Sequence, residues 1–380
     1  MKDFSTIPDI RQVPQNEWDA LVPGGYPFAS YAFLSALEAS GCVSAATGWQ
    51  PSHLLFRDSD GQLRGAVPAY IKQHSYGEYV FDWSWADAYA RYGLDYYPKL
   101  LLGIPFTPAS GPRLLGDPGC FSDLYPQLQS FCEDQHLSGW HLNFPMVDDF
   151  PQPVPDNPAH PDLRSACQFH WFNRGYESFE QYLSHFVSRK RKSVLKERKG
   201  VAAAGVRMVR KTGSAISDDD LRYFYRCYLS TYQQRMSTPY LTLDFFRRLR
   251  DSMGHQMLLV QALRDDRPCA SALYFFDDQT LYGRYWGCTD EISGLHFEAC
   301  YYQGIEFCIE QGLQRFDPGT QGEHKISRGF EPVLTYSLHW LAHPGFQDAV
   351  GRFIREETPH IHAYRDEART LLPFHREENA

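Results

Sequence analysis

The sequence lacks the hallmarks of disulfide-rich secreted proteins, zinc modules and membrane-spanning proteins. Its nine cysteines are odd in number and include no C-x-x-C pair, which argues against both a disulfide framework and a zinc module. No apolar run approaches the roughly 18 residues that a membrane span requires, since the best candidate, residues 100–106, is interrupted by Pro105. The amino terminus shows no charged segment followed by an apolar one, so no secretory signal is expected. We therefore expect a cytoplasmic protein with reduced thiols and no metal site.

Positive charge is scarce except in one segment. The chain has a net charge of −9, but residues 189–211 contain ten basic residues and a single acid, Glu197. That segment carries +9, which leaves −18 for the remainder of the chain. A polyanion would be repelled by most of such a surface and attracted to one place on it. A basic helix that is merely solvated is the alternative.

Length and proline placement predict more than one domain. The chain has 380 residues, of which 43% are hydrophobic and 15% aromatic, as in a packed globular protein. The strongest linker is residues 151–165, which contain five prolines. We expect an N-terminal domain at 1–150 and a C-terminal domain at 166–380, with a basic helix at 178–204. In the first domain we expect strands at 53–56, 62–71 and 77–85.

A strand–helix–strand unit is expected between residues 280 and 317. Residues 280–286 alternate aromatic and small side chains, which favours a strand, and 287–294 supply a turn. Apolar residues then recur at the spacing of one helix face, and Gly312 stands where that helix would end. Residues 314–317 resume an extended segment. Open sheets bind ligands at the carboxyl ends of such parallel strands.

The second of these strands leads directly into a dense polar set. Two turn glycines, Gly319 and Gly322, are followed by four ionisable residues: Glu323, His324, Lys325 and Arg328. Ionisable side chains in a row are poor packing material, and their position after a strand end favours a site. The alternative is a loop making surface ion pairs, each worth about 0–1 kcal/mol.

The hairpin pattern occurs twice, at an offset of 204 residues. The Leu-Leu-Phe sequence at 54–56 aligns with Leu-Leu-Val at 258–260, and Tyr70 aligns with Tyr274. In both halves a helix precedes the hairpin, and a strand and a helix follow it. Few identities are involved, so chance is an alternative, but the order of elements favours two copies of one α/β unit.

This arrangement resembles the FemAB-like acyltransferases, a family built from two tandem GNAT-type (acyl-CoA N-acyltransferase) folds. Residues 188–206, SRKRKSVLKERKGVAAAGV, resemble the basic helix of the family. LQRFDPG at 313–319 resembles its strand ending in Asp-x-Gly, and KISRGF at 325–330 resembles its basic Gly-Phe element. Ser327 stands where the family has a basic residue, and no coiled-coil arm is present. The branch it resembles most is a bacterial, peptidoglycan-biosynthesis-like one, and the implied fold class is mixed α/β with two GNAT-like domains.

The resemblance implies transfer of an activated acyl or aminoacyl group to an amine. Glu323 or His324 would then accept the amine proton, while Lys325 or Arg328 would steady negative charge on the carbonyl oxygen or hold an acceptor phosphate. Substrate binding is expected from two groups of residues. These are Lys190, Arg191 and Lys192 in the basic helix, and Arg284, Trp286 and Asp317 near the two strand ends. Lys190 falls on the apolar face of that helix, where snorkelling is a simpler role than catalysis.

The donor and acceptor remain alternatives. We expect no permanently bound cofactor, and a donor that is either aminoacyl-tRNA or acyl-CoA. Asp290 and Glu291 lie where a coenzyme A pyrophosphate would bind, which favours the aminoacyl-tRNA type. The acceptor would be an anionic or nucleotide-linked amine, such as a peptidoglycan precursor. Nothing in the sequence indicates an oligomeric state.

Two further functions compete with this one. The first is an acetyl-CoA-dependent N-acetyltransferase acting on a small amine. The second is a non-catalytic tandem GNAT protein that binds nucleic acid, for example tRNA, through residues 189–211. The H-x-E sequence at 296–298 has no P-C-x-x-C partner and is rejected as a zinc motif.

Overall fold

The computed structural model describes residues 4–153, 160–320 and 322–375. The chain folds into two compact units, and each is described here by itself. Unit 1 comprises residues 1–167 and 334–363, and unit 2 comprises 168–333 and 364–380. The chain passes between them within β9 (Asp162–Phe172), β15 (Glu331–Leu341) and α11 (Pro344–Thr370). In the described residues no helix combines the length and apolarity needed to cross a membrane.

The division differs from one made in chain order, because residues 334–363 count with the first unit. The expected domain limits of 1–150 and 166–380 therefore stay a prediction. Of the expected linker at 151–165, residues 154–159 lie outside the described residues, and residues 162–165 already belong to β9.

Unit 1 is a mixed α/β unit. One sheet has the order β1-β3-β4-β7, and the other runs β15-β8-β6-β5-β2. In the second sheet, β6 and β8 are parallel and are joined through α4, while β5 pairs antiparallel with β6. The strands are β1 (Ser5–Ile7), β2 (Trp49–Pro51), β3 (His53–Arg57), β4 (Leu63–Val67), β5 (Ala69–Lys72), β6 (Lys99–Leu102), β7 (Leu115–Gly116) and β8 (Gly139–Asn143). The helices are α1 (Gln15–Asp19), α2 (Tyr31–Ala39), α3 (Trp83–Arg91) and α4 (Leu124–Asp134).

The strand expected at 77–85 is wrong. Residues 77–82 form a loop and α3 begins at Trp83. Gly77 has φ +80°, and a Cβ there would lie 2.6 Å from the Phe106 ring, so the chain turns where a strand would continue. Trp85 and Tyr89 then face the core at helical spacing.

Unit 2 repeats this order around a longer sheet, β10-β11-β12-β13-β14-β9. Strand β13 is followed by a crossover helix and then by the parallel strand β14, the counterpart of β6-α4-β8 in unit 1. The strands are β10 (Val206–Thr212), β11 (Met257–Arg264), β12 (Arg267–Phe276), β13 (Thr280–Cys288) and β14 (Arg315–Asp317). The helices are α5 (Phe179–Ser184), α6 (Ser188–Ala203), α7 (Asp218–Gln234), α8 (Leu243–Met253), α9 (Leu295–Phe297) and α10 (Gln303–Gln311).

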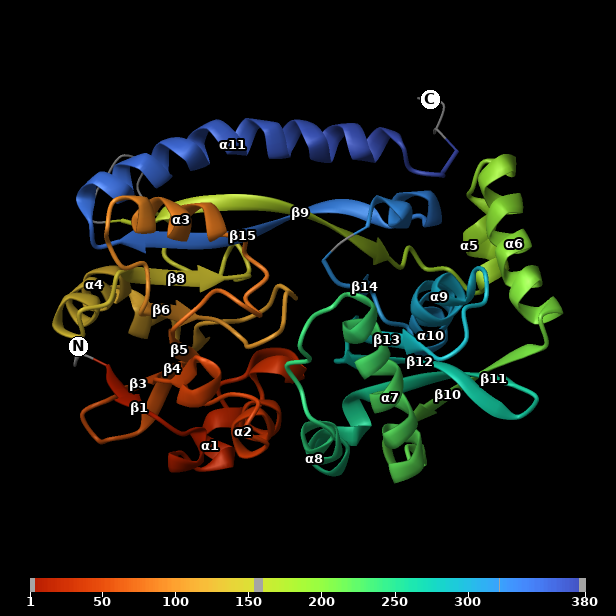
Figure 1. The fold of residues 1–380 in the computed structure, drawn as a ribbon, viewed down its shortest axis with the longest axis horizontal. Coiled ribbons are helices and arrows are strands. Elements are labelled where there is room, and N and C mark those ends of the chain that lie inside the picture. The colour runs from red at the N-terminus through yellow and green to blue at the C-terminus, as the bar shows by residue number, and fades with distance from the viewer. Residues whose placement is uncertain (1–3, 154–159, 321, 376–380) are drawn as a thin grey trace. The chain divides into compact units, whose positions relative to one another are not determined.

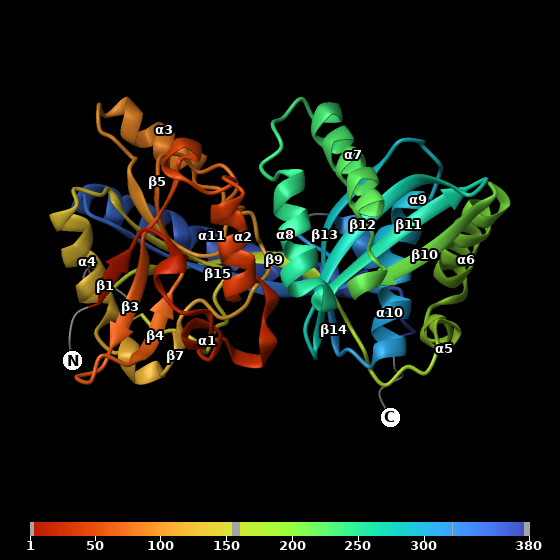
Figure 2. The same ribbon diagram turned by 90° about the horizontal axis from the view of Figure 1, so that it is seen from below.

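The crossover helix of unit 2 contains a π-helical turn, Glu298–Tyr302, between α9 and α10. Gly312 ends the helix in a left-handed conformation with φ +70°, as its position in the sequence predicts. The views in Figures 1 and 2 show α7 and α8 on one face of the β10–β13 strands, with α9 and α10 on the other.

The segment expected to form one basic helix at 178–204 forms two helices, α5 and α6. The break falls at residues 185–187, where Phe186 forms an isolated bridge with Phe374 and the Val187 N–H donates to the Pro373 carbonyl at 2.8 Å. Tertiary pairing therefore overrides a continuous helical pattern.

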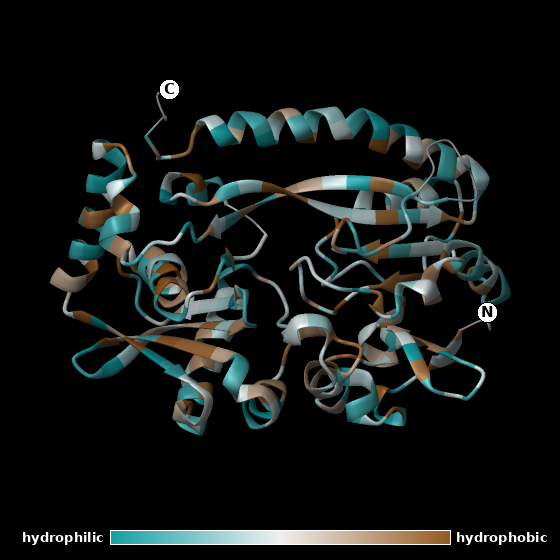
Figure 3. Ribbon diagram, turned by 180° about the vertical axis from the view of Figure 1, so that it is seen from behind, coloured by the Kyte–Doolittle hydropathy of each residue, from teal (hydrophilic) through white to brown (hydrophobic). Residues whose placement is uncertain are grey.

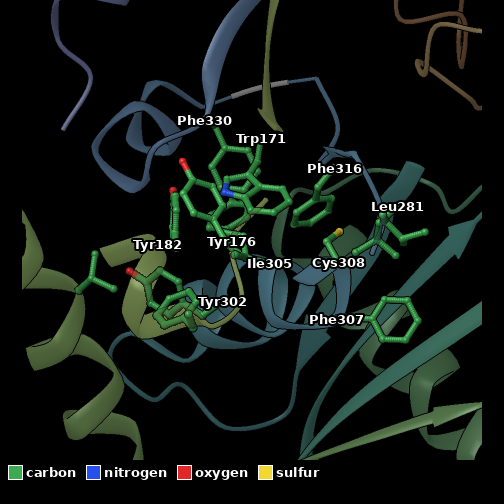
Figure 4. Close-up of a cluster of buried hydrophobic side chains, with 14 of the residues drawn as sticks. Trp171, Tyr176, Tyr182, Leu281, Tyr302, Ile305, Phe307, Cys308, Phe316 and Phe330 are labelled. Atoms are coloured by element: carbon green, nitrogen blue, oxygen red, sulfur yellow. The ribbon is translucent and has the colours of Figure 1, made fainter. Parts of the chain in front are cut away.

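The core of unit 2 lies between the sheet and the helices α5, α6 and α10. Figure 4 shows Trp171, Tyr176, Tyr182 and Phe330 gathered from β9, the loop after it, α5 and the residue just before β15. Hydrophilic and hydrophobic residues are interspersed along α11, as Figure 3 shows.

Candidate active site

Strands β13 and β14 separate after three paired residues. Thr280 pairs with Arg315, and the last pair is Tyr282 with Asp317, where β14 ends. Strand β13 continues to Cys288. Gly319 stays close to this point, since a Cβ built on it would lie 3.6 Å from the Gly283 carbonyl oxygen. The polar segment after β14 therefore begins beside the unpaired half of β13.

A β-bulge marks the same place on β13. Tyr274 pairs with Gly283 and Leu273 pairs with Tyr285, so Arg284 is the extra residue. Bulges bend a strand and re-aim its side chains, and they are frequent beside active sites. The Arg284 guanidinium lies 5.6 Å from the centre of the Tyr285 ring and is half-buried.

Lys325 is a buried cation at this separation. The residue is 1% exposed and its Nζ donates to the Gly319 carbonyl at 2.6 Å. Burial lowers the pKa of Lys325 to about 8, although the nearby Asp317 carboxylate opposes the shift. An ordinary lysine would remain charged at that pH, whereas this one loses its proton close to neutrality.

Asp317, the last residue of β14, is a buried carboxylate beside the same loop. It is 2% exposed and accepts a hydrogen bond from the Gly319 N–H at 2.9 Å. His170 Nε2 lies 3.6 Å from Asp317 Oδ1. Burial lowers the pKa of His170 to about 4, so this imidazole is neutral at pH 7. The hydrogen bond from the Gly319 N–H therefore fixes the Asp317 carboxylate against the loop that follows β14.

Arg328 is buried and fully engaged. Its Nη2 contacts both carboxylate oxygens of Glu197 at 2.9 Å, and its Nε donates to the Tyr302 hydroxyl at 3.0 Å. Its Nη1 donates to the His324 carbonyl at 2.7 Å, while the guanidinium lies 3.4 Å from the centre of the Phe297 ring. The sole acid of the basic segment, Glu197, therefore compensates this cation, and Arg328 fixes the backbone on which His324 stands.

His324 lies at the exposed side of an aromatic cluster. Its Nε2 is 2.8 Å from the Tyr301 hydroxyl, and the His296 ring lies 6.1 Å away between centroids. Burial, followed by the charges of Lys325 and Arg328, lowers the pKa of His324. The imidazole is therefore neutral at pH 7 and able to accept a proton.

Glu323, by contrast, is exposed and accepts a hydrogen bond from the Tyr364 hydroxyl at 2.8 Å.

The expected substrate-binding residues fall into two places. Trp286 packs on the His296 ring at 5.5 Å between centroids and so belongs to the aromatic cluster. Lys190, Arg191 and Lys192 lie in the first turn of α6, roughly 8–11 Å along the helix axis from Glu197. Helix α6 thus contacts the site through Glu197, whereas its basic residues 190–192 lie nearer the start of the helix and away from Arg328.

Several residues of the site were not singled out from the sequence. They are Glu197, Phe297, Tyr301, Tyr302 and His170, which lie on separate helices and a distant strand. Tyr301 and Tyr302 belong to the π-helical turn, and such turns are frequent at functional sites. Both tyrosines lie inside the helix that the sequence predicts after residue 294, where the apolar spacing gives no sign of a site.

Unit 1 contains a buried ionisable network that the sequence analysis also missed. Lys99 is fully buried, with its Nζ 2.9 Å from Glu78 Oε2 and also bonded to Asp82. The Tyr96 hydroxyl donates to Asp82 at 2.7 Å and lies 3.2 Å from His141 Nε2. The network was hidden because its members come from loops and strands far apart in the sequence.

Solved structures with the same fold were found at low identity. The chain matches FemX with a TM-score of 0.51 at 11% identity, covering 87% of this chain and 96% of that one. It matches the C-terminal domain of a proposed lysylphosphatidylglycerol synthetase from Agrobacterium fabrum with a TM-score of 0.51 at 10% identity, covering 86% and 90%. A conserved protein of unknown function from Bacteroides thetaiotaomicron gives 0.50 at 9% identity, covering 89% and 99%.

The likeness to these structures confirms the predicted fold class, mixed α/β with GNAT-like units. No curated protein matches the chain. Residues 9–376 match the FemAB-like family, which is described as peptidoglycan biosynthesis and recognition. Family and fold together support an acyltransferase. The match spans nearly the whole chain, and the protein therefore belongs to the FemAB-like family.

Proposed function

We propose that unit 2 transfers an aminoacyl group from an ester donor of the aminoacyl-tRNA type to an amine of an anionic acceptor. The family description, peptidoglycan biosynthesis and recognition, favours a peptidoglycan precursor as this acceptor. The observation that carries the proposal is Lys325, a buried cation with a lowered pKa, placed where β13 and β14 part. This is the place where an open α/β sheet binds its ligand.

The reaction forms a C–N bond and breaks an ester C–O bond. The acceptor amine attacks the ester carbonyl, and the carbonyl oxygen becomes an oxyanion in the tetrahedral intermediate. The intermediate then expels the tRNA ribose hydroxyl, which leaves with a proton, while the amine nitrogen loses one. Catalysis therefore needs a positive group at the oxyanion and a proton acceptor at the amine.

Lys325 is the group that we assign to the oxyanion. At pH 7 it is still mostly protonated, because its pKa is about 8. Its surroundings are dry, so its charge acts on a nearby oxygen more strongly than a solvated ammonium would. The Gly319 carbonyl holds the Nζ in place before substrate binds, which reduces the reorganisation needed during the reaction.

His324 is the group that we assign to the amine proton. It follows the same turn as Lys325, is accessible, and is neutral at pH 7. Tyr301 holds the ring in position through its hydroxyl. Arg328 acts as a positioning residue, since its hydrogen bonds go to Glu197, Tyr302 and the His324 backbone. Glu323 is the weaker candidate for a base, because its carboxylate is engaged by Tyr364.

The basic first turn of α6 suits the phosphates of either substrate. Lys190 and Arg191 are half-buried and Lys192 is exposed, so three cations stand within one helical turn. Phosphate groups are attracted to such a turn in a chain that is otherwise acidic.

Acetyl-CoA is the second candidate donor, and one ion pair weakens the argument against it. Asp290, expected to repel a pyrophosphate, is paired with Arg264, so its charge is compensated. Glu291 remains exposed in the turn before the crossover helix, which begins at Leu295. The acids at this turn are therefore a smaller obstacle to coenzyme A than the sequence suggests.

The donor is tested by supplying both candidates to the purified chain with a nucleotide-linked muropeptide as acceptor. Mass spectrometry should detect an acceptor heavier by one aminoacyl residue with charged tRNA, and no acetylated acceptor with acetyl-CoA. A product formed with acetyl-CoA and not with charged tRNA would show that acetyl-CoA is the donor and would contradict the proposed one. Salt-sensitive tRNA binding without any product from either donor would contradict acyl transfer with these substrates and favour simple nucleic-acid binding.

A further inference from the structure

Three large aromatic side chains are exposed around the start of α3 in unit 1. Tyr76 is 55% exposed, Phe81 57% and Trp83 39%. The Tyr76 and Trp83 rings lie 4.8 Å apart between centroids, and Phe81 stands two residues before Trp83. In Figure 2, α3 lies at the outer edge of unit 1. These three residues are called here the aromatic patch, and none of them has a role in the proposed acyl transfer.

The acids of the same segment point inward. Residues 73–86 are all described, and the acids among them are Glu78 and Asp82, which are 5% and 2% exposed. Both accept hydrogen bonds from the buried Lys99. Charged residues ordinarily face water and aromatic ones the core, so this segment shows the reverse distribution. A surface with its charges inside and its rings outside suits an apolar partner, because no charge has to be desolvated on contact.

The exposed side chains of residues 73–86 are uncharged at pH 7. This segment, described throughout, contains no lysine or arginine, and its one histidine, His74, is half-buried. Burial lowers the pKa of His74 below its usual 6.5, so the ring is neutral. Arg164 of β9, which contacts this segment, is compensated by Glu357 at 2.7 Å. The next exposed charge along the chain is Asp87, one helical turn beyond the patch.

The aromatic patch is too small for a stable protein interface. With 150–250 Å² for each aromatic side chain, the three exposed fractions amount to roughly 300 Å². A standard protein interface covers about 800 Å² on each partner. A few exposed Trp, Tyr and Phe side chains are instead typical of proteins that bind at the headgroup level of a bilayer, where the rings are buried and the polar tips of Trp and Tyr stay hydrated.

We propose that the aromatic patch binds unit 1 to the surface of a lipid bilayer. The rings of Phe81 and Trp83 enter the boundary between headgroups and acyl chains, and the Tyr76 hydroxyl stays among the headgroups. Binding depends on apolar burial and not on lipid charge, because the segment presents no cation and the chain has a net charge of −9. The proposal does not depend on the acyl transfer assigned to unit 2.

The test measures co-sedimentation of the full chain with two kinds of vesicle, phosphatidylcholine alone and an equal mixture of phosphatidylcholine and phosphatidylglycerol. We expect binding to phosphatidylcholine and no stronger binding to the mixture, because anionic lipid repels an acidic chain. Binding that requires the anionic lipid would assign the contact to the basic segment 189–211 and overturn the proposal. Absence of binding to both vesicles would overturn it as well.

Matched variants locate the membrane contact. F81S/W83S removes two rings of the patch and should lower the affinity for phosphatidylcholine vesicles by about tenfold. M236S/L371S removes two apolar side chains of unit 2, which are 96% and 57% exposed, and should bind as the unchanged chain does. All four side chains are exposed, so thermal unfolding should change little in either variant. An equal loss of binding in both variants would refute the patch.

Trp83 offers a second measurement that keeps the patch apolar. Brominated acyl chains quench the fluorescence of a tryptophan that enters the bilayer, so vesicles of brominated phosphatidylcholine should quench the unchanged chain. W83F retains a ring that can enter, and it should bind the same vesicles with most of the quenching lost. Quenching that persists fully in W83F would place another tryptophan at the membrane and contradict the proposal.

Discussion

Burial of Lys325 lowers the stability of the folded chain but suits the proposed chemistry. Its pKa in the folded chain is about 8, below the ordinary value of 10.5. Between these two pH values the unfolded chain binds the additional proton, so unfolding becomes less favourable as pH rises from 8 to 10.5. Below pH 8 the buried ammonium lowers stability. Sites of this kind are kept for function rather than for folding.

The pH profile of turnover should show this pKa. If the protonated Lys325 stabilises the oxyanion, the rate falls as pH rises through about 8, although the acceptor amine becomes more reactive in the same range. Replacing Lys325 with Arg keeps a cation whose pKa lies far higher. We expect K325R to lower the rate but to lose the alkaline fall. An alkaline fall unchanged in K325R would assign that pKa to another group.

Glu197 and Arg328 should behave as a coupled pair. In E197Q the buried guanidinium loses its counter-charge, and we expect a loss of about 1–3 kcal/mol in the free energy of unfolding. E197Q should cost less stability in the R328M variant, because that variant has no buried guanidinium to be left without a counter-charge. Denaturation of the four chains of this cycle measures the coupling, and additive effects would show that the pair is not coupled.

The candidate cation and base could be predicted from the sequence, but their support could not. Lys325 and His324 follow a strand end and two turn glycines, which is a local signal. Glu197 and Tyr302 lie more than twenty residues away in the chain, and only tertiary packing brings them to Arg328. Single-sequence reasoning reaches contacts that are local or periodic, and these are neither.

At the scale of elements, the strand–helix–strand unit of β13, α10 and β14 was predicted because its periodicity is strong. The π-helical turn inside it was not predicted, since one extra residue in a turn leaves a similar apolar spacing. The same limit explains the broken helix at 185–187, where the pattern is helical throughout but the backbone pairs with the segment at 373–374.

The first turn of α6 should bind phosphates. Replacing Lys190, Arg191 and Lys192 together with Ser should weaken tRNA binding and lower the magnitude of the salt slope, d log K/d log[salt], by about 2–3 for three lost phosphate contacts.

Filter binding at several salt concentrations measures the slope. The control replaces Arg222, Arg248 and Arg267, three exposed cations outside this helix, with Ser. An equal loss in the control would mean that binding follows net charge and not this turn.

At the scale of the whole molecule, the order of elements was predictable and the division into units was not. The repeated hairpin and crossover appear in both units, as the internal repeat indicates. The return of residues 334–363 to unit 1 has no local signal, because β15 passes from one unit to the other within a continuous strand.

The buried network of unit 1 should make its stability depend on pH. His141 and His339 are buried, with their Nδ1 atoms 2.7 Å apart. Burial lowers the pKa of His141 to about 3 and that of His339 well below its ordinary 6.5. Both rings are neutral in the folded chain, so below pH 6.5 the unfolded chain binds more protons and unfolding becomes easier. Glu78 acts in the opposite direction, since burial raises its pKa to about 7.

Other buried groups of unit 1 also titrate in this range, Lys72 with a pKa lowered by burial to about 6 among them, so the contribution of His141 is measured by difference. Hydrogen exchange of the β6 and β8 amides at pH 5 and 6, corrected for intrinsic rates, measures the slope of stability with pH. In H141N this slope should fall by about 1.4 kcal/mol per pH unit, the value for one proton, whatever the absolute stability. A slope that H141N leaves unchanged would exclude His141 as its source.

The central claim is that Lys325 of unit 2 carries acyl transfer, and K325M tests it most directly. Methionine has a similar volume and no charge, so the free energy of unfolding at pH 7 should be unchanged or higher. Single-turnover amide formation from charged tRNA should nevertheless fall by about a hundredfold or more, the size expected for loss of an oxyanion partner. A folded K325M that forms amide at the rate of the unchanged chain would contradict the account.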